Sequence, residues 1–549
     1  MADNYDEYSK DQLVRLLRER DRRPHFGLVW ERDEIDHDLS VNNDFVALDW
    51  DAELSCGDGP QQNLIIEGDN FDALRTLRMT HAGRVKCIYI DPPYNTGNRD
   101  FIYNDRFVDK DDNYRHSKWL EFMFRRLELA KELLTKDGVI FVSIDDNEVF
   151  HLGLLMEQVF ESSNFLACIA WEKRYTRSNN AKLFYSLKDS IIVFRASPAL
   201  VTLKETRTAK ADSNYANPDG DPNGAWMTTS YVNPATKAMR PNLVYSVSNP
   251  QGKEIHHPTH AWKYAKSEYE QHKADNRLYW GQNGTATYPR LKLYLEDAKP
   301  MVPIDLWHYK ETGTSDEGGN ELKEIFGKAV FDNPKPTRLI ERILRIATNP
   351  GDIILDFFAG SGTTAQAVMN LNKEDDGNRR FILVSSTEAT NDAPDKNLCR
   401  DVCAERVRRV ITGYHNKKDE AVPALGGGFA YLRCRRIPAA TVFRSIQHAQ
   451  IWTALQLTHE VALSPYQSAL PMQTAQGKRG LVIYLPKISD TVLDVLQTAI
   501  ANVSQAVVYS WQPALLAQRL TDARLAFEPI PAFLVNRFSA RSGAKGGRP

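Results

Sequence analysis

Residues 85–94 read Val-Lys-Cys-Ile-Tyr-Ile-Asp-Pro-Pro-Tyr, and this stretch decides how the rest of the chain is interpreted. The first six residues are largely β-branched, aromatic or otherwise apolar, which predicts a buried strand. The strand must stop at Pro92 and Pro93, because proline cannot donate a ladder hydrogen bond. An acid, a stiff backbone and the ring of Tyr94 therefore meet at the carboxyl end of a strand, where open parallel sheets bind ligands.

The turn Asp91–Tyr94 carries the groups needed to activate the exocyclic amino nitrogen of a planar base. That nitrogen is a poor nucleophile because its lone pair is delocalised into the ring. The Asp91 carboxylate and a backbone carbonyl of the Pro92-Pro93 turn can accept its two N–H bonds and aim the lone pair, while Tyr94 stacks on the base. The alternative is a strand-ending turn with an aspartate that caps a helix.

The composition is that of an ordinary globular protein of two or three domains. The chain has 549 residues, of which 42% are hydrophobic and 26% charged. Its six cysteines include no C-x-x-C pair, so no metal site or disulfide framework is expected, and a reducing, cytoplasmic compartment fits. The polar start does not resemble a signal peptide, and no apolar run is long enough to suggest a membrane span. The net charge of −2 neither favours nor excludes nucleic acid.

Strands and helices alternate between residues 64 and 160, which is typical of a parallel α/β sheet. Asn70 is expected to cap the first helix of this region. Asp69 lies at the end of the preceding strand, where it either starts the helix or hydrogen-bonds a bound adenosine. The polar segment 95–112 is expected to be a loop over the site. The expected strands are 64–66, 85–90 and 139–144, and the expected helices are 71–77, 119–134 and 149–160.

A glycine-containing turn follows a later strand. Residues 356–364 read Asp-Phe-Phe-Ala-Gly-Ser-Gly-Thr-Thr, between an expected strand and an expected helix. Gly360 and Gly362 would let a ligand approach the backbone closely at a helix N-terminus. A dinucleotide-binding fingerprint is disfavoured, because Ala365 stands where its third glycine belongs. Glu388 follows the next strand, near the position that usually meets a ribose.

The regions outside these two segments have less regular patterns. Residues 171–309 are rich in aromatic residues, Asn, Pro, Lys and Arg, a mixture that suits phosphate and base-edge contacts; a solvated irregular domain is the equal alternative. Residues 9–23 are expected to form a docking helix or a DNA-contacting arm, and residues 33–59 to be irregular. A small α/β unit is expected from residue 425, followed by a basic, disordered tail at 537–549.

Taken together, Asp91-Pro92-Pro93-Tyr94 and Phe358-Ala359-Gly360-Ser361-Gly362 resemble the motifs of the amino-group DNA methyltransferases. The catalytic motif precedes the cofactor motif, which is the order of the β-class, and in that class the target-recognition region lies between the two. Residues 313–322 and 333–336 are especially similar to the modification (Mod) subunits of type III restriction-modification systems. The resemblance covers about residues 60–415.

The resemblance implies an α/β fold with a Rossmann-like methyltransferase sheet in circularly permuted motif order. It also implies an inserted target-recognition domain and a small C-terminal α/β unit. The expected divisions are an N-terminal helix and arm (1–60), a catalytic half (61–170), a target-recognition domain (171–310), a cofactor-binding half (311–424) and a C-terminal domain with a basic tail (425–549).

The function that the resemblance implies is site-specific methylation of adenine N6 in double-stranded DNA, with S-adenosyl-L-methionine as cofactor, in restriction-modification or phage defence. Asp91, Pro92, Pro93 and Tyr94 would hold the flipped adenine. Aspartate at position 91 favours adenine over cytosine N4, and no Pro-Cys pair is present for cytosine C5 methylation. The residues implied at the cofactor are Asp69, Lys335, Pro336, Asp356, Phe358, Gly360, Gly362 and Glu388.

Two other functions stay open from the sequence. One is a same-fold methyltransferase that acts on cytosine N4, RNA or a protein amide nitrogen. The other is a non-catalytic DNA-binding subunit of a defence complex. A homodimer and a restriction, helicase or other defence-system subunit are candidate partners, and the N-terminal helix and the C-terminal unit are candidate docking surfaces.

Overall fold

The computed structural model of the chain describes residues 9–10, 28, 30, 43–57, 62–97, 102–103, 106–107, 112, 114–177, 183–207, 209–389, 393–530 and 533–534. The chain divides into two compact units, residues 1–203 with 304–549 and residues 204–303. The helix expected at 9–23, apart from Ser9 and Lys10, and the expected disordered tail at 537–549 lie outside the described residues.

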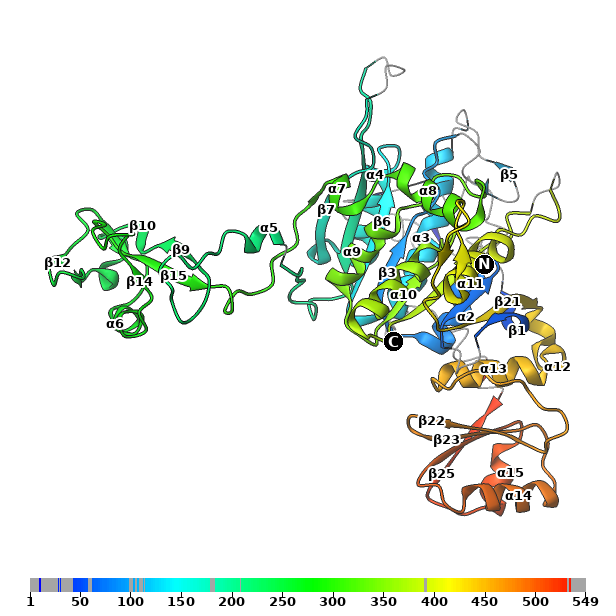
Figure 1. Ribbon diagram of the computed structural model, residues 1–549. Coiled ribbons are helices and arrows are strands. Elements are labelled where there is room, and N and C mark those ends of the chain that lie inside the picture. Colours follow the sequence, from blue (N-terminus) through cyan, green and yellow to red (C-terminus); the bar gives the residue numbers. More distant parts are fainter. Residues whose placement is uncertain are drawn as a thin grey trace. The chain divides into compact units, whose positions relative to one another are not determined.

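Ten described strands form one sheet in the larger unit (Figure 1). Their order is β1-β21-β2-β18-β17-β3-β6-β8-β7-β16. From β21 to β6 the strands run parallel, whereas β1 and β8 are antiparallel to their neighbours. The predicted α/β sheet is therefore confirmed. The strands are β1 (Phe45–Cys56), β2 (Leu64–Glu67), β3 (Val85–Ile90), β6 (Leu134–Ile144), β7 (Phe165–Glu172), β8 (Lys188–Arg195), β16 (Leu306–Trp307), β17 (Ile353–Asp356), β18 (Arg380–Ser385) and β21 (Phe429–Ile437).

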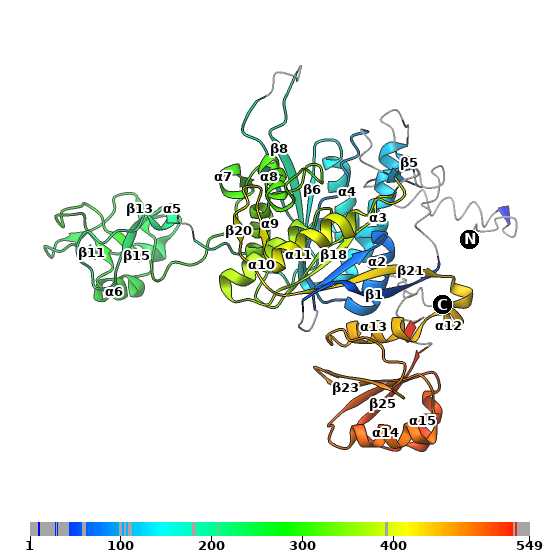
Figure 2. The same ribbon diagram turned by 45° about the vertical axis from the view of Figure 1, so that its right-hand side comes forward.

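Helices cover both faces of this sheet (Figures 1 and 2). Strand β3 shows why: all six of its residues are buried, with Ile88 and Ile90 in one core and Cys87 and Tyr89 in the other. Side chains of α2 (Asn70–His81), α3 (Arg115–Leu133) and α4 (Val149–Phe160) fill the first core. Those of α9 (Thr337–Ala347), α10 (Thr363–Asp375) and α11 (Glu405–Thr412) fill the second.

The order in which the chain adds strands to the sheet reverses between β17 and β3, and this reversal positions the site. These strands are parallel neighbours, with Ile354 opposite Cys87. After β3 the chain passes to β6 on one side, and after β17 it passes to β18 on the other. The loops 91–94 and 356–362 thus leave the same sheet edge in opposite directions. Such a topological switch point is where open α/β sheets bind their ligands.

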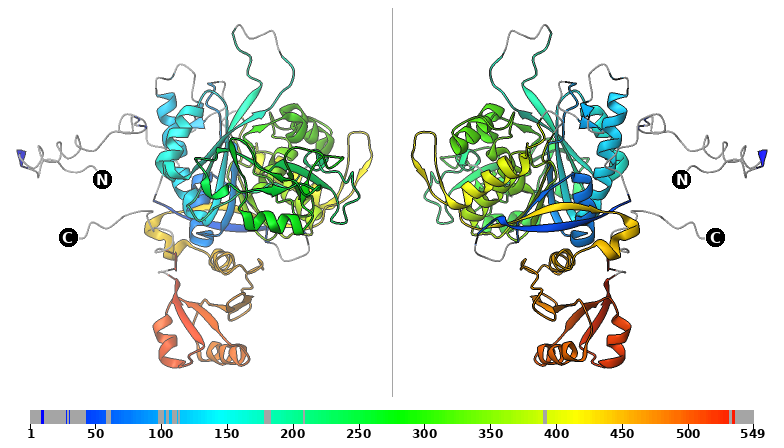
Figure 3. Two further views of the ribbon diagram at one scale, coloured as in Figure 1. Left: turned by 90° about the vertical axis from the view of Figure 1, so that its left-hand side faces the viewer. Right: turned by 90° about the vertical axis from the view of Figure 1, so that its right-hand side faces the viewer.

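Two expectations about the segments at the β1 edge of the sheet are wrong. Most of the supposedly irregular segment 33–59 that is described forms β1, which lies antiparallel to β21 (Figure 3). The boundary expected at 425 fails too, because β21 pairs with both β1 and β2. Acidic residues made β1 look like a loop, but cross-strand arginines compensate them: Asp51 lies 2.8 Å from Arg433.

Residues 442–529 form helices and strands that are not part of the ten-stranded sheet. The strands β22 to β25 form a four-stranded sheet at the place where the sequence predicts a small α/β unit. The elements are α12 (Val442–Ser445), α13 (His448–Thr458), β22 (Gln473–Gly477), β23 (Gly480–Leu485), α14 (Asp490–Ile500), β24 (Ala506–Ser510), α15 (Pro513–Arg519) and β25 (Leu525–Pro529).

The unit 204–303 has an aromatic core that includes Tyr231, Trp262 and Trp280. It is narrower than the insertion expected at 171–310, because β7 and β8 hydrogen-bond into the central sheet. Its elements are α5 (Ala209–Asp212), β9 (Trp226–Ser230), β10 (Val232–Thr236), β11 (Val247–Ser248), β12 (Glu254–Ile255), β13 (His260–Trp262), α6 (Lys266–Ala274), β14 (Leu278–Tyr279) and β15 (Arg290–Tyr294).

Short elements complete the larger unit. They are β4 (Ile102–Tyr103), β5 (Arg106–Phe107), α7 (Tyr309–Thr312), α8 (Ser315–Phe326), β19 (Tyr414–His415) and β20 (Ala421–Val422). Each helix in the described ranges is too short or too polar to cross a lipid bilayer.

Candidate functional site

Asp91, Tyr94 and Lys335 form one hydrogen-bonded group at the switch point. The Tyr94 hydroxyl donates to Asp91 Oδ1 at 2.9 Å, and Lys335 Nζ donates to Asp91 Oδ2 at 2.6 Å. Lys335 Nζ also donates to the Tyr94 hydroxyl at 2.9 Å. The fold thus brings together residues 244 positions apart. The ammonium of Lys335, expected at the cofactor, neutralises the strand-end acid directly.

A second carboxylate, which the sequence did not single out, contacts the same tyrosine. Asp189 at the start of β8 lies 3.4 Å from the Tyr94 hydroxyl and is paired with Lys173 at 2.6 Å. Burial, followed by the negative charges of Asp91 and Asp189, raises the pKa of Tyr94 well above its usual value. The phenol therefore stays protonated and remains a donor. The only feature of the sequence that could have pointed to Asp189 as a site residue was the polar triplet 188–190, which comes directly before an apolar run.

The two prolines of the turn have different surroundings. Trp119 on α3 donates its Nε1 hydrogen to the Pro93 carbonyl at 2.7 Å. Among the hydrogen bonds between described residues, none ends on the Pro92 carbonyl. Of the two carbonyls that the sequence left as alternatives, the one of Pro92, a buried residue, therefore accepts no hydrogen bond from a described residue.

The turn after β17 is held by its own acid. Asp356 is buried and accepts hydrogen bonds from Thr364 Oγ1 at 2.6 Å and from the Phe358 backbone N–H at 3.0 Å. Burial raises the pKa of Asp356 to about 7. The carboxylate thus links the two ends of the turn, and a direct contact with a cofactor stays a prediction.

Gly360 and Gly362 are needed for the backbone of this turn. Both have left-handed φ angles, +48° and +79°. A Cβ at 360 would lie 2.9 Å from the ring of Phe331, and a Cβ at 362 would lie 3.1 Å from the Cys403 carbonyl oxygen. The glycines therefore accommodate neighbouring parts of the chain, in addition to the ligand approach expected from the sequence.

The end of β2 reaches the same region through Asp69 and Asn70. The expected cap is wrong: Asp69, not Asn70, caps α2, accepting from the Phe71 backbone N–H at 2.9 Å. Aspartate and asparagine both suit this position, so the sequence could not separate them. The Asn70 amide instead donates to the Phe357 carbonyl at 3.0 Å, which ties the loops after β2 and β17 together.

Three further predicted residues have these positions. Pro336 is the N-terminal cap residue of α9, and Phe358 is half-buried with its ring 6.0 Å from that of Phe122. Glu388 has a φ of +51° and pairs with Lys396 at 2.8 Å. The role of all three at a cofactor stays a prediction.

Asparagine at position 356 is expected to change how stability depends on pH. The buried Asp356 holds a proton up to about pH 7, whereas an aspartate in the unfolded chain has a pKa of 3.8. The folded state therefore binds more protons between these values, and its stability falls as pH rises from about 4 to 7. Asp356→Asn should flatten part of that decline in thermal denaturation from pH 4 to 8. An unchanged slope would contradict the buried, protonated acid.

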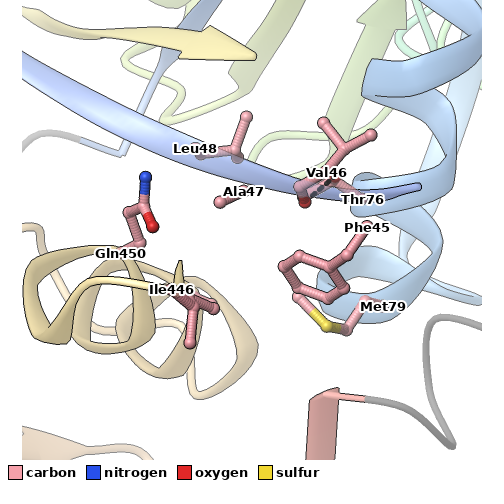
Figure 4. Close-up of a pocket in the computed structure, with 9 residues that line it drawn as sticks. Phe45, Val46, Ala47, Leu48, Thr76, Met79, Ile446 and Gln450 are labelled. Atoms are coloured by element: carbon pink, nitrogen blue, oxygen red, sulfur yellow. Dashed lines mark hydrogen bonds between the residues drawn. The ribbon is translucent and has the colours of Figure 1, made fainter. Parts of the chain in front are cut away.

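The structure also has a small apolar pocket away from this site. It lies between β1, α2 and the segment 446–454, and is lined by residues such as Phe45, Met79 and Ile446 (Figure 4). Thr76 on α2 donates to the Val46 carbonyl at 2.8 Å beside it. This pocket carries none of the predicted site residues.

The doubly wound sheet, with an acid–tyrosine turn and a glycine turn at its switch point, defines a Rossmann-like α/β protein. Residues 85–391 match the family described as DNA methylase, and the chain belongs to this family.

The chain is similar in sequence to three relatives of known class. The Mod subunit of the type III restriction-modification enzyme StyLTI from Salmonella typhimurium strain LT2 is 33% identical over 63% of this chain and 57% of that protein. The EcoPI Mod subunit of Escherichia phage P1 is 32% identical over 60% and 58%. The type II methyltransferase M.KpnI of Klebsiella pneumoniae is 31% identical over 58% and 79%. The chain thus spans less than two thirds of the length of these two Mod subunits.

Proposed function

We propose that this protein is a site-specific DNA methyltransferase that transfers a methyl group from S-adenosyl-L-methionine to N6 of adenine. The observation that carries the proposal is the group formed by Asp91, Tyr94 and Lys335 beside the glycine turn of Gly360 and Gly362. Both predicted motifs, far apart in sequence, start from adjacent strand ends. The similarity to Mod subunits of restriction-modification enzymes and to the type II methyltransferase M.KpnI supports the methyltransferase part of the proposal.

The residues around Asp91 suit an extruded adenine. The Asp91 carboxylate and the Pro92 carbonyl can accept the two hydrogens of the amino group, which directs the nitrogen lone pair toward an electrophile. Tyr94 offers an aromatic face, and its protonated hydroxyl keeps Asp91 oriented. The target must leave the duplex, because its amino group is buried in the base stack.

The residues on the other side of the switch point suit S-adenosyl-L-methionine, which supplies an electrophilic methyl group on a sulfonium. Asp91 and Asp69 lie at this edge, and each is paired with a cation, Lys335 and Arg126. Lys335 Nζ, 2.6 Å from Asp91 Oδ2, can bind a ligand carboxylate. We assign the role of the adenosine-contacting acid to Asp69, whose second oxygen lies 3.3 Å from Arg126.

Restriction-modification or phage defence is the setting that we propose, in the cytoplasm, where the DNA is. By similarity to the Mod subunits, a restriction or helicase subunit is the proposed partner, and a homodimer is a further proposal. We assign target recognition to the unit 204–303, which interrupts the two halves of the central sheet in sequence.

Expression in a host without DNA methyltransferases, followed by single-molecule sequencing of modified bases, tests the proposal. N6-methyladenine is expected at one fixed sequence motif and nowhere in cells that carry the empty vector. N4-methylcytosine would contradict the assignment to adenine. Absence of any modified base, together with transfer to RNA or protein in vitro, would overturn the proposed substrate class.

A further inference from the structure

Asn95 comes directly after the turn 91–94 and is held in an unusual conformation. Its side chain is fully buried, and its φ of +56° lies in the left-handed region, which asparagine adopts more readily than most residues. The amide Nδ2 donates to Glu148 Oε1 at 2.5 Å and to the Arg115 carbonyl at 3.3 Å. The backbone that follows Tyr94 is thus anchored through one buried side chain.

Glu148 joins three elements at this point. It lies between β6 and α4, where it is the residue before the first turn of the helix, and it is fully buried. Its Oε1 also accepts from Nδ1 of His116 on α3 at 2.6 Å. Burial raises the pKa of Glu148 to about 7. The charged and titratable groups around the carboxylate are Arg115 and His116 from α3 and His151 from α4.

Arg115 decides which nitrogen of His116 carries the proton. Its Nη2 lies 3.2 Å from His116 Nε2. A guanidinium can only donate, so Nε2 must accept, and the proton of the neutral ring is then on Nδ1, which faces Glu148. Burial and the charge of Arg115 lower the pKa of His116, which favours this neutral ring.

His116, Glu148 and His151 could also be considered as ligands of a metal ion, because their ligand atoms lie within 4.8 Å of one another. Arg115 argues against that use of the cluster. A metal on Nδ1 of His116 would leave a hydrogen on Nε2, pointing at a donor, and would bring a second cation close to the guanidinium. Both Asn95 and His116 already donate to the same carboxylate oxygen.

We propose that Glu148 is a positioning residue for the catalytic turn. Through Asn95 it fixes the carboxyl end of the turn, while Trp119 fixes the Pro93 carbonyl from α3. The two anchors, at the Pro93 carbonyl and at Asn95, hold Tyr94 between them, and Glu148 itself touches no substrate. This role rests on the proposed function, but the ordering of the turn does not depend on turnover.

The test compares Glu148→Ala, Asn95→Ala and the double variant with the wild-type full-length protein. Single-turnover methyl transfer to DNA at saturating S-adenosyl-L-methionine should fall by about 100-fold in each single variant, since a small displacement of reacting groups costs this much. The double variant should be no slower than the single ones, because the two residues act as a unit. Affinity for the cofactor should stay within about threefold of wild type. Glu157→Ala, at an exposed position of α4, is the matched control and should keep the wild-type rate.

Hydrogen exchange of the amides of residues 94–97 provides a readout without catalysis. Exchange there should be faster in Glu148→Ala than in wild type and unchanged in Glu157→Ala. Unchanged exchange, or effects of the two substitutions that multiply in the double variant, would overturn the positioning role. So would loss of this protection on dialysis against EDTA with recovery on adding Zn²⁺, because the cluster would then be a metal site. If the wild-type protein transferred no methyl group, the proposed function would be contradicted, but the positioning role would still be tested by hydrogen exchange.

Discussion

Asp91→Asn is expected to reduce methyl transfer by at least about 1,000-fold while the affinity for S-adenosyl-L-methionine changes by no more than a few fold. Asparagine has nearly the same shape and can still accept a hydrogen bond from Tyr94. It removes the negative charge that accepts the amino hydrogen of the base and pairs with Lys335. The loss should therefore appear in the rate constant of methyl transfer and not in cofactor binding.

Asp91→Ala should also abolish methyl transfer, and it should lower the stability of the fold more than Asp91→Asn does. The Lys335 side chain is only 9% exposed, and alanine would leave its ammonium without a carboxylate partner. Single-turnover kinetics, calorimetric titration of the cofactor and thermal denaturation separate these effects. Asp494→Asn on α14 is a control for removal of an exposed aspartate. Transfer at the wild-type rate by either Asp91 variant would remove this residue from the mechanism.

Gly360→Val is expected to weaken S-adenosyl-L-methionine binding by at least about tenfold, which corresponds to ~1.4 kcal/mol. Two causes act together. A β-branched residue is strained at a φ of +48°, and its Cβ would lie 2.9 Å from the Phe331 ring, so either the turn or the ring must move. Calorimetric titration with the cofactor measures the effect.

Gly426→Val is the matched control for that substitution. Gly426 also has a left-handed φ, +77°, but no atom lies within 4 Å of the position that a Cβ would take there. Valine at 426 carries the backbone strain without the collision and should lower the melting temperature while the cofactor affinity stays at the wild-type value. Equal loss of affinity in both variants, or in neither, would contradict the placement of Gly360 at the cofactor.

Prediction from sequence worked best where the signal is local. The apolar run of β3 stops at Ile90, just before Asp91 and the two prolines, and the helix expected at 149–160 matches α4 at both ends. The glycine turn before α10 was also evident, because left-handed backbone favours glycine. These features depend on residues within one strand, one turn or one helix.

Prediction failed where the charge of a residue is neutralised by a partner that is distant in sequence. Strand β1 contains Asp49 and Asp51, which read as loop residues until the arginines of β21 are placed beside them. The same applies to Asp189 and Glu148, whose partners in the site come from other strand ends and helices. A sequence shows the charge of such residues but not the charge that neutralises it.

The sequence alone determined that an acid–proline–tyrosine turn and a glycine turn each follow a buried strand, because proline, glycine and apolar runs constrain the backbone by themselves. Only the tertiary structure decided that β3 and β17 are parallel neighbours, that Lys335 pairs with Asp91, and that Glu148 anchors Asn95. The reason is physical: strand order and burial set which charges meet, and a buried charge is stable only beside a partner that folding brings to it.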